Sequence, residues 1–190
     1  MNTLQRYALA VLSGLLLSAA WPVKGVTPLI FFAFVPLFFI QHDLGKPENK
    51  GKGGQLFLLA LSSFFIWNSL TTWWIWNSTA IGGIAALVLN SIFMASVFWL
   101  FHFTKTQLYQ NKKGLAILLF YWLSFEYLHM HWDLNWPWLH LGHVFSPMPH
   151  WIQWYEFTGV PGGTAWVLIL NMLAFKSIQQ ALQWKTKARS

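Results

Sequence analysis

The chain has 190 residues, of which 56% are hydrophobic, 19% aromatic and 9% charged, and its formal net charge is +7. This composition does not suit a water-soluble domain, because there are too few charged side chains to cover the surface. The basic residues form small clusters between apolar runs rather than one stripe, which argues against a nucleic-acid-binding protein. Cysteine is absent, which excludes a disulfide framework, a thiolate metal site and a cysteine nucleophile within these residues.

Six apolar runs predict membrane-spanning helices, since a span needs about 20 mostly apolar residues. They cover residues 7–20, 27–40, 55–74, 81–103, 114–130 and 163–182. The first two are short for a full span, and we expect a tilted hairpin with a tight turn at residues 21–25. Pro28 suits the first turn of the second helix, and Pro36 is expected to kink the end of that helix.

The distribution of Lys and Arg predicts the orientation of these helices, because cytoplasmic loops carry the excess of basic residues. Only Lys24 falls on one side of the predicted membrane. The other side collects Arg6, Lys46, Lys50, Lys52, Lys105, Lys112, Lys113, Lys185, Lys187 and Arg189. The sequence therefore predicts an all-α, polytopic membrane bundle of about six transmembrane helices, with both termini in the cytoplasm and a single domain over residues 1–190.

The N-terminal run has a second interpretation as a signal peptide. Arg6 precedes a short apolar core, and Ser18-Ala19-Ala20 resembles a small-residue cleavage site. The turn that leads directly into another apolar run favours a retained helix, but charge bias does not distinguish the two.

The outer loop, residues 132–162, is the most informative stretch of the sequence. Its density of Trp is typical of the headgroup level of a membrane, where an indole ring has one wet edge and one apolar face. One interpretation is an aromatic belt. The other is a re-entrant or interfacial segment that holds lipid chains, since the loop is too long and too apolar for a simple connector.

Glu126 and His129 lie near the outer end of the fifth predicted helix, on one face and within hydrogen-bonding reach. An ionisable residue in a span suggests a functional site, although a structural interhelical hydrogen bond is the slightly favoured explanation. The histidines of this region match no metal-site spacing, so we expect no metal. Three asparagines are expected to form interhelical hydrogen bonds: Asn68, Asn90 and Asn171.

Several short motifs, in order along nearly the whole chain, resemble the membrane part of apolipoprotein N-acyltransferase. Each is weak alone, but the ordered set is fairly specific. They are Ala20-Trp21-Pro22 with Pro28 and Phe34-Val35-Pro36-Leu37, Trp73-Trp74-Ile75-Trp76 with Gly82-Gly83, Glu126, Trp136-Pro137-Trp138-Leu139 with Gly142, and Ile152-Gln153, Gly159-Val160, Gly162 and Asn171. The family commonly has an Arg three residues after the glutamate, where this chain has the titratable His129.

The resemblance implies a multi-pass protein of the bacterial cytoplasmic (inner) membrane that takes part in lipoprotein maturation. Family members transfer an acyl chain from a phospholipid to the amine of a lipoprotein's N-terminal cysteine, using a Glu, a Lys and a Cys of a nitrilase-like domain. Those catalytic residues have no matching positions here, so whether the chain is an enzyme stays open and we expect no activity from it alone. No cofactor is implied.

We therefore expect a fragment or split half of such an acyltransferase that serves lipid access and docking. Its partners would be phospholipid, a lipoprotein substrate and a separate nitrilase-like catalytic chain. The residues expected to guide lipid or substrate are Trp73, Glu126, His129, Trp136, Pro137, Trp138 and Gly142. The alternatives are a small membrane transporter or channel, disfavoured because Glu126 is the only acidic residue in a predicted span, and a structural membrane partner of another complex.

Overall fold

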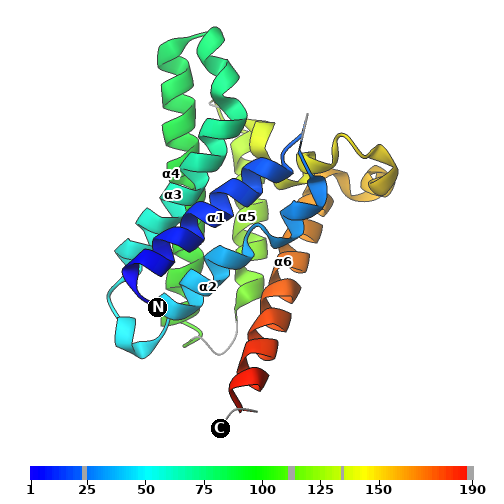
Figure 1. Cartoon of the computed structure of the whole chain (residues 1–190). Coiled ribbons are helices and arrows are strands. Elements are labelled where there is room, and N and C mark those ends of the chain that lie inside the picture. Colours follow the sequence, from blue (N-terminus) through cyan, green and yellow to red (C-terminus); the bar gives the residue numbers. More distant parts are fainter. Residues whose placement is uncertain (23–24, 111–113, 134, 188–190) are drawn as a thin grey trace.

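The computed structural model describes residues 1–22, 25–110, 114–133 and 135–187, with side chains up to residue 184, and contains no strand among them (Figure 1). The α-helices are α1 (Thr3–Ala20), α2 (Val35–Leu44), α3 (Gly53–Thr72), α4 (Ala80–Gln107), α5 (Leu115–Met130) and α6 (Tyr155–Lys187). The 3₁₀ segments are η1 (Thr27–Phe32), η2 (Pro47–Asn49), η3 (Trp73–Asn77), η4 (Pro137–Leu139), η5 (Leu141–Phe145) and η6 (Pro149–Trp151). The predicted all-α fold is confirmed.

Five stretches of these described residues are long and apolar enough to cross a membrane. They are Thr3–Ala20, Thr27–Leu44, Gly53–Asn77, Ala80–Gln107 and Tyr155–Trp184, and α5 is a shorter apolar helix of 16 residues. The first two stretches, expected to be short, each reach 18 residues. The predicted fifth helix is instead the shortest of the six apolar stretches.

The helices alternate in direction, so that one end of the bundle carries the basic residues. α1 begins there and α6 ends there, together with the α2–α3 connection and the end of α4 (Figure 1). We call this the basic end and the opposite one the outer end. The position of the described loops at the basic end agrees with the alternation predicted from the charges. Several residues used in that prediction lie outside the described part, namely Lys24, Lys112, Lys113 and Arg189, as do the side chains of Lys185 and Lys187.

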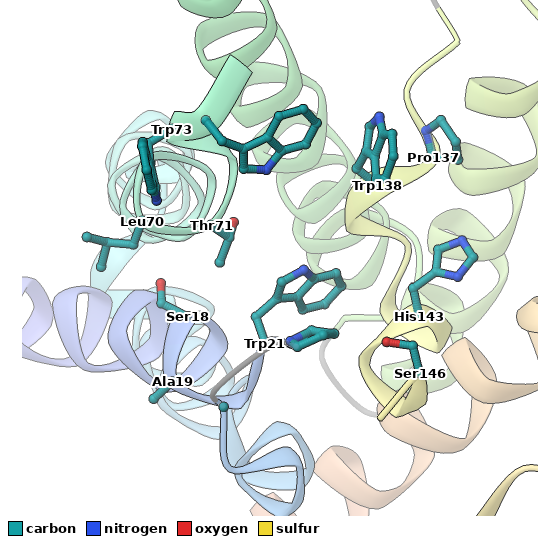
Figure 2. A pocket seen from close by; sticks show the side chains of 13 residues that line it. Ser18, Ala19, Trp21, Leu70, Thr71, Trp73, Pro137, Trp138, His143 and Ser146 are labelled. Carbon is teal, nitrogen blue, oxygen red and sulfur yellow. The ribbon is translucent and has the colours of Figure 1, made fainter. Parts of the chain in front are cut away.

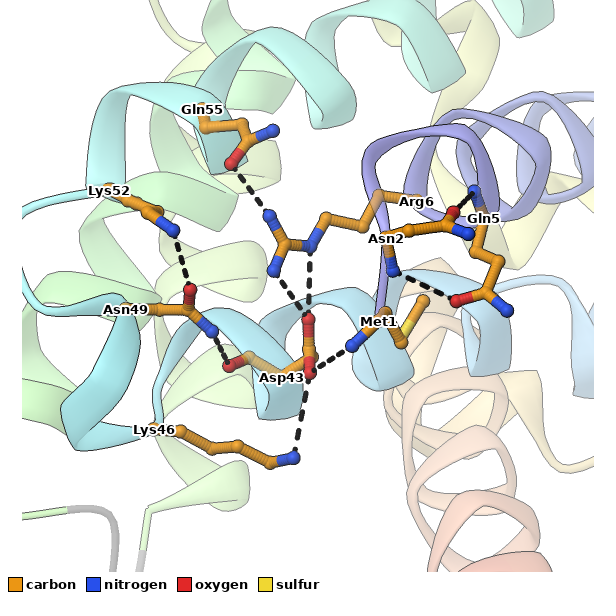
Figure 3. Close-up of polar contacts among 9 residues, drawn as sticks. All are labelled: Met1, Asn2, Gln5, Arg6, Asp43, Lys46, Asn49, Lys52 and Gln55. Carbon is orange, nitrogen blue, oxygen red and sulfur yellow. Dashed lines mark hydrogen bonds and ion pairs between the residues drawn. The ribbon is translucent and has the colours of Figure 1, made fainter.

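A buried ion pair joins three helices at the basic end (Figure 3). Asp43, near the end of α2, accepts from Arg6 of α1 at 2.8 Å from Nη2 and 3.0 Å from Nε. The remaining Nη1 of Arg6 donates to Gln55 Oε1 of α3 at 3.0 Å. All polar groups of the guanidinium fork that face the bundle are therefore used to fix α1 against α2 and α3.

The segment predicted as one second helix is broken at Ala33 and Phe34 into η1 and α2. Free backbone groups at such a break are costly where no water is present. Asn171 of α6 binds two groups at the break: its Oδ1 accepts from the Phe34 N–H at 2.8 Å, and its Nδ2 donates at 2.7 Å to the Ile30 carbonyl, which also accepts from the Ala33 N–H. The break is thus held by the last helix of the chain, and the predicted interhelical role of Asn171 is confirmed.

The two prolines of this segment occupy helix starts. Pro28 lies in the first turn of η1, as predicted. Pro36 lies in the first turn of α2 rather than at the end of a helix, so the prediction of a kinked end was wrong. Proline is tolerated in a first turn because its missing N–H has no partner there in any case.

α3 and α4 form a hairpin that projects past the other helices at the outer end (Figure 1). The sequence contains no Asp, Glu, Lys or Arg between Lys52 and Lys105. Inside the hairpin, Asn90 Nδ2 donates to Asn68 Oδ1 at 2.8 Å, which confirms the predicted interhelical contact of these two side chains. Asn68 Nδ2 also donates to Met94 Sδ at 3.8 Å, and large apolar side chains such as Phe64 and Phe98 fill the remaining contact.

The outer loop consists of short 3₁₀ segments, η4 to η6, followed by the first turns of α6. α6 begins at Tyr155, earlier than the predicted start at residue 163, but its path is interrupted at Gly159, which has a left-handed φ of 63°. Pro161 follows this interruption inside the helix. Glycine suits the left-handed conformation, so the chain bends at Gly159 and α6 is kinked there.

Candidate functional site

A pocket of about 1000 Å³ lies at the outer end, where three parts of the chain meet. Its wall is formed by the end of α1 with the turn after it, by the end of α3 with η3, and by the outer loop (Figure 2). The lining residues are Ser18, Ala19, Trp21, Pro22, Gly25, Leu70, Thr71, Trp73, Trp74, Pro137, Trp138, His143 and Ser146. This volume is at the upper end of the range typical of small-molecule sites.

Indole rings dominate the pocket wall. Trp74 of η3 packs edge-to-face on Trp138 of η4, with ring centroids 5.3 Å apart, so the hairpin and the outer loop touch across the pocket. Trp21 lies between them and packs edge-to-face on the buried Trp67 at 5.1 Å (Figure 2). Such edge-to-face pairs add about 0.5–1.5 kcal/mol to the burial of the rings, which makes the wall stiff and apolar.

Two of the three side-chain hydroxyl groups that line the pocket are directed to helix carbonyls. Ser18 Oγ donates to the Gly14 carbonyl at 2.8 Å, and Thr71 Oγ1 donates to the Trp67 carbonyl at 2.6 Å. A hydroxyl engaged in this way is not activated by a neighbouring base. These two hydroxyls are turned toward the protein, and the remaining wall is mainly aromatic, which suits an apolar chain.

Glu126 does not line this pocket but anchors the outer loop behind it. The carboxylate is buried, with 3% of the residue exposed. Its Oε1 accepts from the Leu141 N–H at 2.8 Å and from Trp122 Nε1 at 3.1 Å, and its Oε2 accepts from Thr164 Oγ1 at 2.7 Å. One side chain of α5 thus holds η5 and α6 together.

Gly142 lies where η5 crosses α6. Its N–H donates to Thr164 Oγ1 at 3.0 Å, and its carbonyl accepts from the Tyr155 hydroxyl at 2.8 Å. A Cβ at this position would come within 2.2 Å of the Val160 carbonyl oxygen. Only glycine allows this approach of two backbones, and through Thr164 the crossing is connected to Glu126.

His129 does not contact Glu126, so the expected hydrogen bond between them was wrong. Its ring stacks on Phe125 of the preceding turn, with centroids 5.1 Å apart, and packs against Phe93 of α4 at 5.9 Å. Its Nε2 is buried and has no hydrogen-bond partner among the described residues. The side chain therefore belongs to an aromatic cluster between α4 and α5, while Glu126 is occupied by donors from other elements.

Trp136 also stays behind the pocket wall. Its indole Nε1 is buried without a partner in the described part of the chain, and its ring lies 6.4 Å from that of Trp138. Of the seven predicted residues, the structure brings Trp73, Pro137 and Trp138 into the pocket. The other four, Glu126, His129, Trp136 and Gly142, do not line it.

His140, which directly precedes η5, and His143 within η5 form a stacked pair, with ring centroids 5.9 Å apart. Burial, with smaller contributions from charge repulsion by His143 and His129, lowers the pKa of His140 to about 4. Burial also lowers the pKa of His143. Both rings are therefore neutral at pH 7, and the described residues contain no group of three or more His, Cys, Asp or Glu side chains arranged to hold a metal ion.

Sequence reasoning missed several wall residues, chiefly Trp21, Trp74 and His143. Trp21 and Trp74 follow apolar runs at the same predicted end of the bundle. That shared position was the available signal for Trp21 and Trp74. Nothing in the spacing of His143 distinguished it from the other histidines of the loop.

Comparison with known proteins places this architecture in one family. Residues 13–173 match the family described as apolipoprotein N-acyltransferase N-terminal domain. The chain is 27% identical over 184 residues to apolipoprotein N-acyltransferase of Chlorobaculum tepidum, covering 95% of this chain and 33% of that protein. It is 25% identical over 181 residues to apolipoprotein N-acyltransferase of Geobacter metallireducens, covering 91% of this chain and 33% of that protein.

The chain thus spans about a third of the length of these curated relatives. No solved structure matches it significantly. The family match extends from within α1 to α6 and includes the whole pocket wall and the Glu126 anchor. This multi-pass helical chain belongs to the family of apolipoprotein N-acyltransferase N-terminal domains.

Proposed function

We propose that this chain is the membrane part of an apolipoprotein N-acyltransferase-like system in the bacterial cytoplasmic membrane, where it admits a phospholipid acyl chain and docks the reacting partners. The observation that carries the proposal is the aromatic pocket of about 1000 Å³ at the outer end. The family match supports phospholipid and lipoprotein as the molecules that meet there.

The depth of the pocket suits a lipid ligand. α5 has 16 residues and is therefore about 24 Å long, less than the hydrocarbon thickness of about 30 Å. With its start at the basic end, α5 finishes short of the outer boundary of the hydrocarbon core. The outer loop, and the pocket wall that it provides, then begin within reach of acyl chains.

Acyl transfer itself requires chemistry that the described pocket does not offer. A thioester needs a thiolate, and the 190 residues contain no Cys. We assign the transfer step to a nitrilase-like segment, on the same or a separate chain, that works above the pocket. Glu126 does not support the transporter alternative, because both of its carboxylate oxygens accept hydrogen bonds from protein donors.

A lipid-binding experiment tests the pocket directly. The chain is reconstituted with a phospholipid that carries a photoactivatable group at the end of one acyl chain, and crosslinked residues are mapped by mass spectrometry. We expect crosslinks at Trp21 and Trp138. Trp138→Ala, which removes wall surface, and Ser146→Trp, which fills the pocket, should both reduce them, whereas Trp184→Ala at the other end of α6 should not.

A reconstitution experiment tests the division of labour. The chain alone, supplied with phospholipid and a lipoprotein peptide, should give no N-acylated peptide by mass spectrometry. Addition of a nitrilase-like catalytic segment should restore transfer, and Trp138→Ala should weaken it. Robust acylation by the chain alone, or crosslinks spread evenly over lipid-facing helices, would contradict the proposal.

A further inference from the structure

The tip of the α3–α4 hairpin, residues 73–84, is an exposed surface that the pocket does not explain. Its large apolar side chains are unusually free: Ile81 is 83% exposed, Trp73 61% and Trp76 57%. The turn between them is polar, with Asn77, Ser78 and Thr79 exposed. The tip therefore presents aromatic and aliphatic groups next to a polar turn and carries no charge.

The length of the hairpin fixes how far this tip reaches. α4 has 28 residues and is therefore about 42 Å long, whereas the hydrocarbon core is about 30 Å and the whole bilayer with headgroups about 40–45 Å. Lys105 in the last turn of α4 and Lys52 before α3 mark the basic end of the hairpin. With these lysines at the inner interface, the other end of α4 passes the hydrocarbon core and stops within the outer headgroup layer.

We propose that the hairpin tip is an interfacial anchor, with Trp73, Trp76 and Ile81 embedded among the lipid headgroups of the outer leaflet. Its exposed face is continuous with the exposed side of α4, where Ile84 and Val88 are also exposed. Indole rings are most stable at this level, where an apolar face and a wet N–H are both accommodated. The uncharged polar turn gains the hydration that it needs at the same depth.

The embedded tip sets the depth of the molecule whether or not the pocket receives acyl chains. Trp73 and Trp74 belong to both the tip and the pocket wall, so the hairpin side of the pocket rises to headgroup level. On the opposite side the shorter α5 keeps the outer loop deeper. A protein partner seated on the tip is the competing arrangement, and it would bury these side chains away from lipid.

Site-directed spin labelling measures this depth, and the absence of Cys from the chain gives a clean background. Labels are introduced through Ser78→Cys and Ile81→Cys at the tip, Val88→Cys on the exposed side of α4, and Lys50→Cys at the basic end. The full chain is placed in phospholipid vesicles, and collisions with oxygen and with a water-soluble nickel complex are compared. Ser78→Cys replaces an exposed side chain, so it tests the proposal even if Ile81→Cys disturbs the fold.

The expected result is an oxygen-to-nickel collision ratio at both tip labels between those of Val88→Cys and Lys50→Cys. In bilayers with longer acyl chains, the ratio at the tip should shift toward the Val88→Cys value, because the hydrocarbon boundary moves outward. A tip as nickel-accessible as Lys50→Cys would place it in free solvent and overturn the proposal. Protection from both reagents would indicate a protein contact and would also overturn it.

Discussion

The α3–α4 hairpin and the outer loop face each other across the same pocket but are stabilised in opposite ways. The hairpin consists of long helices that satisfy their own backbone groups, and Asn68 joins them through side-chain hydrogen bonds to Asn90 at 2.8 Å and to Met94 Sδ at 3.8 Å. The outer loop is a series of 3₁₀ segments whose backbone depends on Glu126, Thr164 and Tyr155. Irregular backbone at membrane depth needs protein partners because water is not available there.

Polar side chains therefore stabilise the outer-loop wall of the pocket, whereas apolar packing mainly stabilises the hairpin wall. The helix lengths add a second difference. α4 exceeds α5 by 12 residues, from 28 and 16, which corresponds to about 18 Å along the bundle. Four experiments challenge the comparison, from the largest expected effect to the smallest.

Glu126→Ala should have the largest effect. It leaves the Leu141 N–H, the Thr164 hydroxyl and the Trp122 indole N–H without their acceptor. Because each buried group left unpaired costs about 1–3 kcal/mol, we expect the free energy of unfolding to fall by about 3 kcal/mol or more. Denaturation in mixed micelles followed by circular dichroism measures it, with the exposed Glu156→Ala as the control. Equal losses in the two variants would show that the anchor is not structural.

Acidification should weaken the outer loop selectively. Burial lowers the pKa of His140 from 6.5 to about 4, so between these values the unfolded state binds more protons than the folded state. The contribution is complete above about pH 6.5 and is lost as the pH falls toward 4, by at most about 3 kcal/mol. Unfolding measured from pH 7.5 to 4.5 should show this slope, and His140→Phe should reduce it. A slope unchanged in His140→Phe but removed in the exposed His150→Asn would assign the titration elsewhere.

Gly142→Ala and Gly54→Ala form a matched pair for the two regions. The added methyl group at 142 meets the Val160 carbonyl oxygen, whereas at 54 it meets nothing within 4 Å. We expect a loss of about 1–3 kcal/mol for Gly142→Ala from overpacking. Gly54→Ala, in the first turn of α3, should be neutral or stabilise by up to about 1 kcal/mol. Thermal unfolding compares them directly, and a destabilised Gly54→Ala variant would contradict the open environment of that site.

Asn90→Leu should have the smallest effect. It removes the hydrogen bond to Asn68 inside the hairpin, but Asn68 Nδ2 keeps its contact with the Phe64 carbonyl. Interhelical hydrogen bonds in membranes contribute about 0.6 kcal/mol on average, so a loss of that order is expected in the same unfolding measurement. A loss as large as that of Glu126→Ala would mean that the hairpin also depends on buried polar contacts.

The sequence predicts the long helices well because their apolar runs are local signals. The break at Ala33 is different, since it is stabilised by Asn171, a residue 137 positions away from its partner Phe34. No local pattern reveals such a partner. For the same reason Pro36 was assigned to a kinked helix end although it lies at a helix start.

In the candidate site, too, the residues with a local sequence signal were predicted and the long-range contacts were not. The Trp-rich motifs Trp73 and Pro137-Trp138 were found because indole rings at helix ends are an interfacial signal, and they line the pocket. The face that Glu126 shares with His129 was visible from their spacing. The donors that Glu126 accepts from, Leu141 and Thr164, come from elements whose packing the sequence does not specify, so its actual role was not predictable.

The break between η1 and α2 also has a consequence for biosynthesis. The Phe34 N–H finds its partner only after residue 171 has been synthesised. Until α6 enters the membrane, this segment carries an unsatisfied backbone N–H or adopts a different, continuous helix. The segment around Ala33 and Phe34 therefore reaches its final geometry only after α6 is in place, and an intermediate that lacks α6 should leave this backbone N–H without its partner.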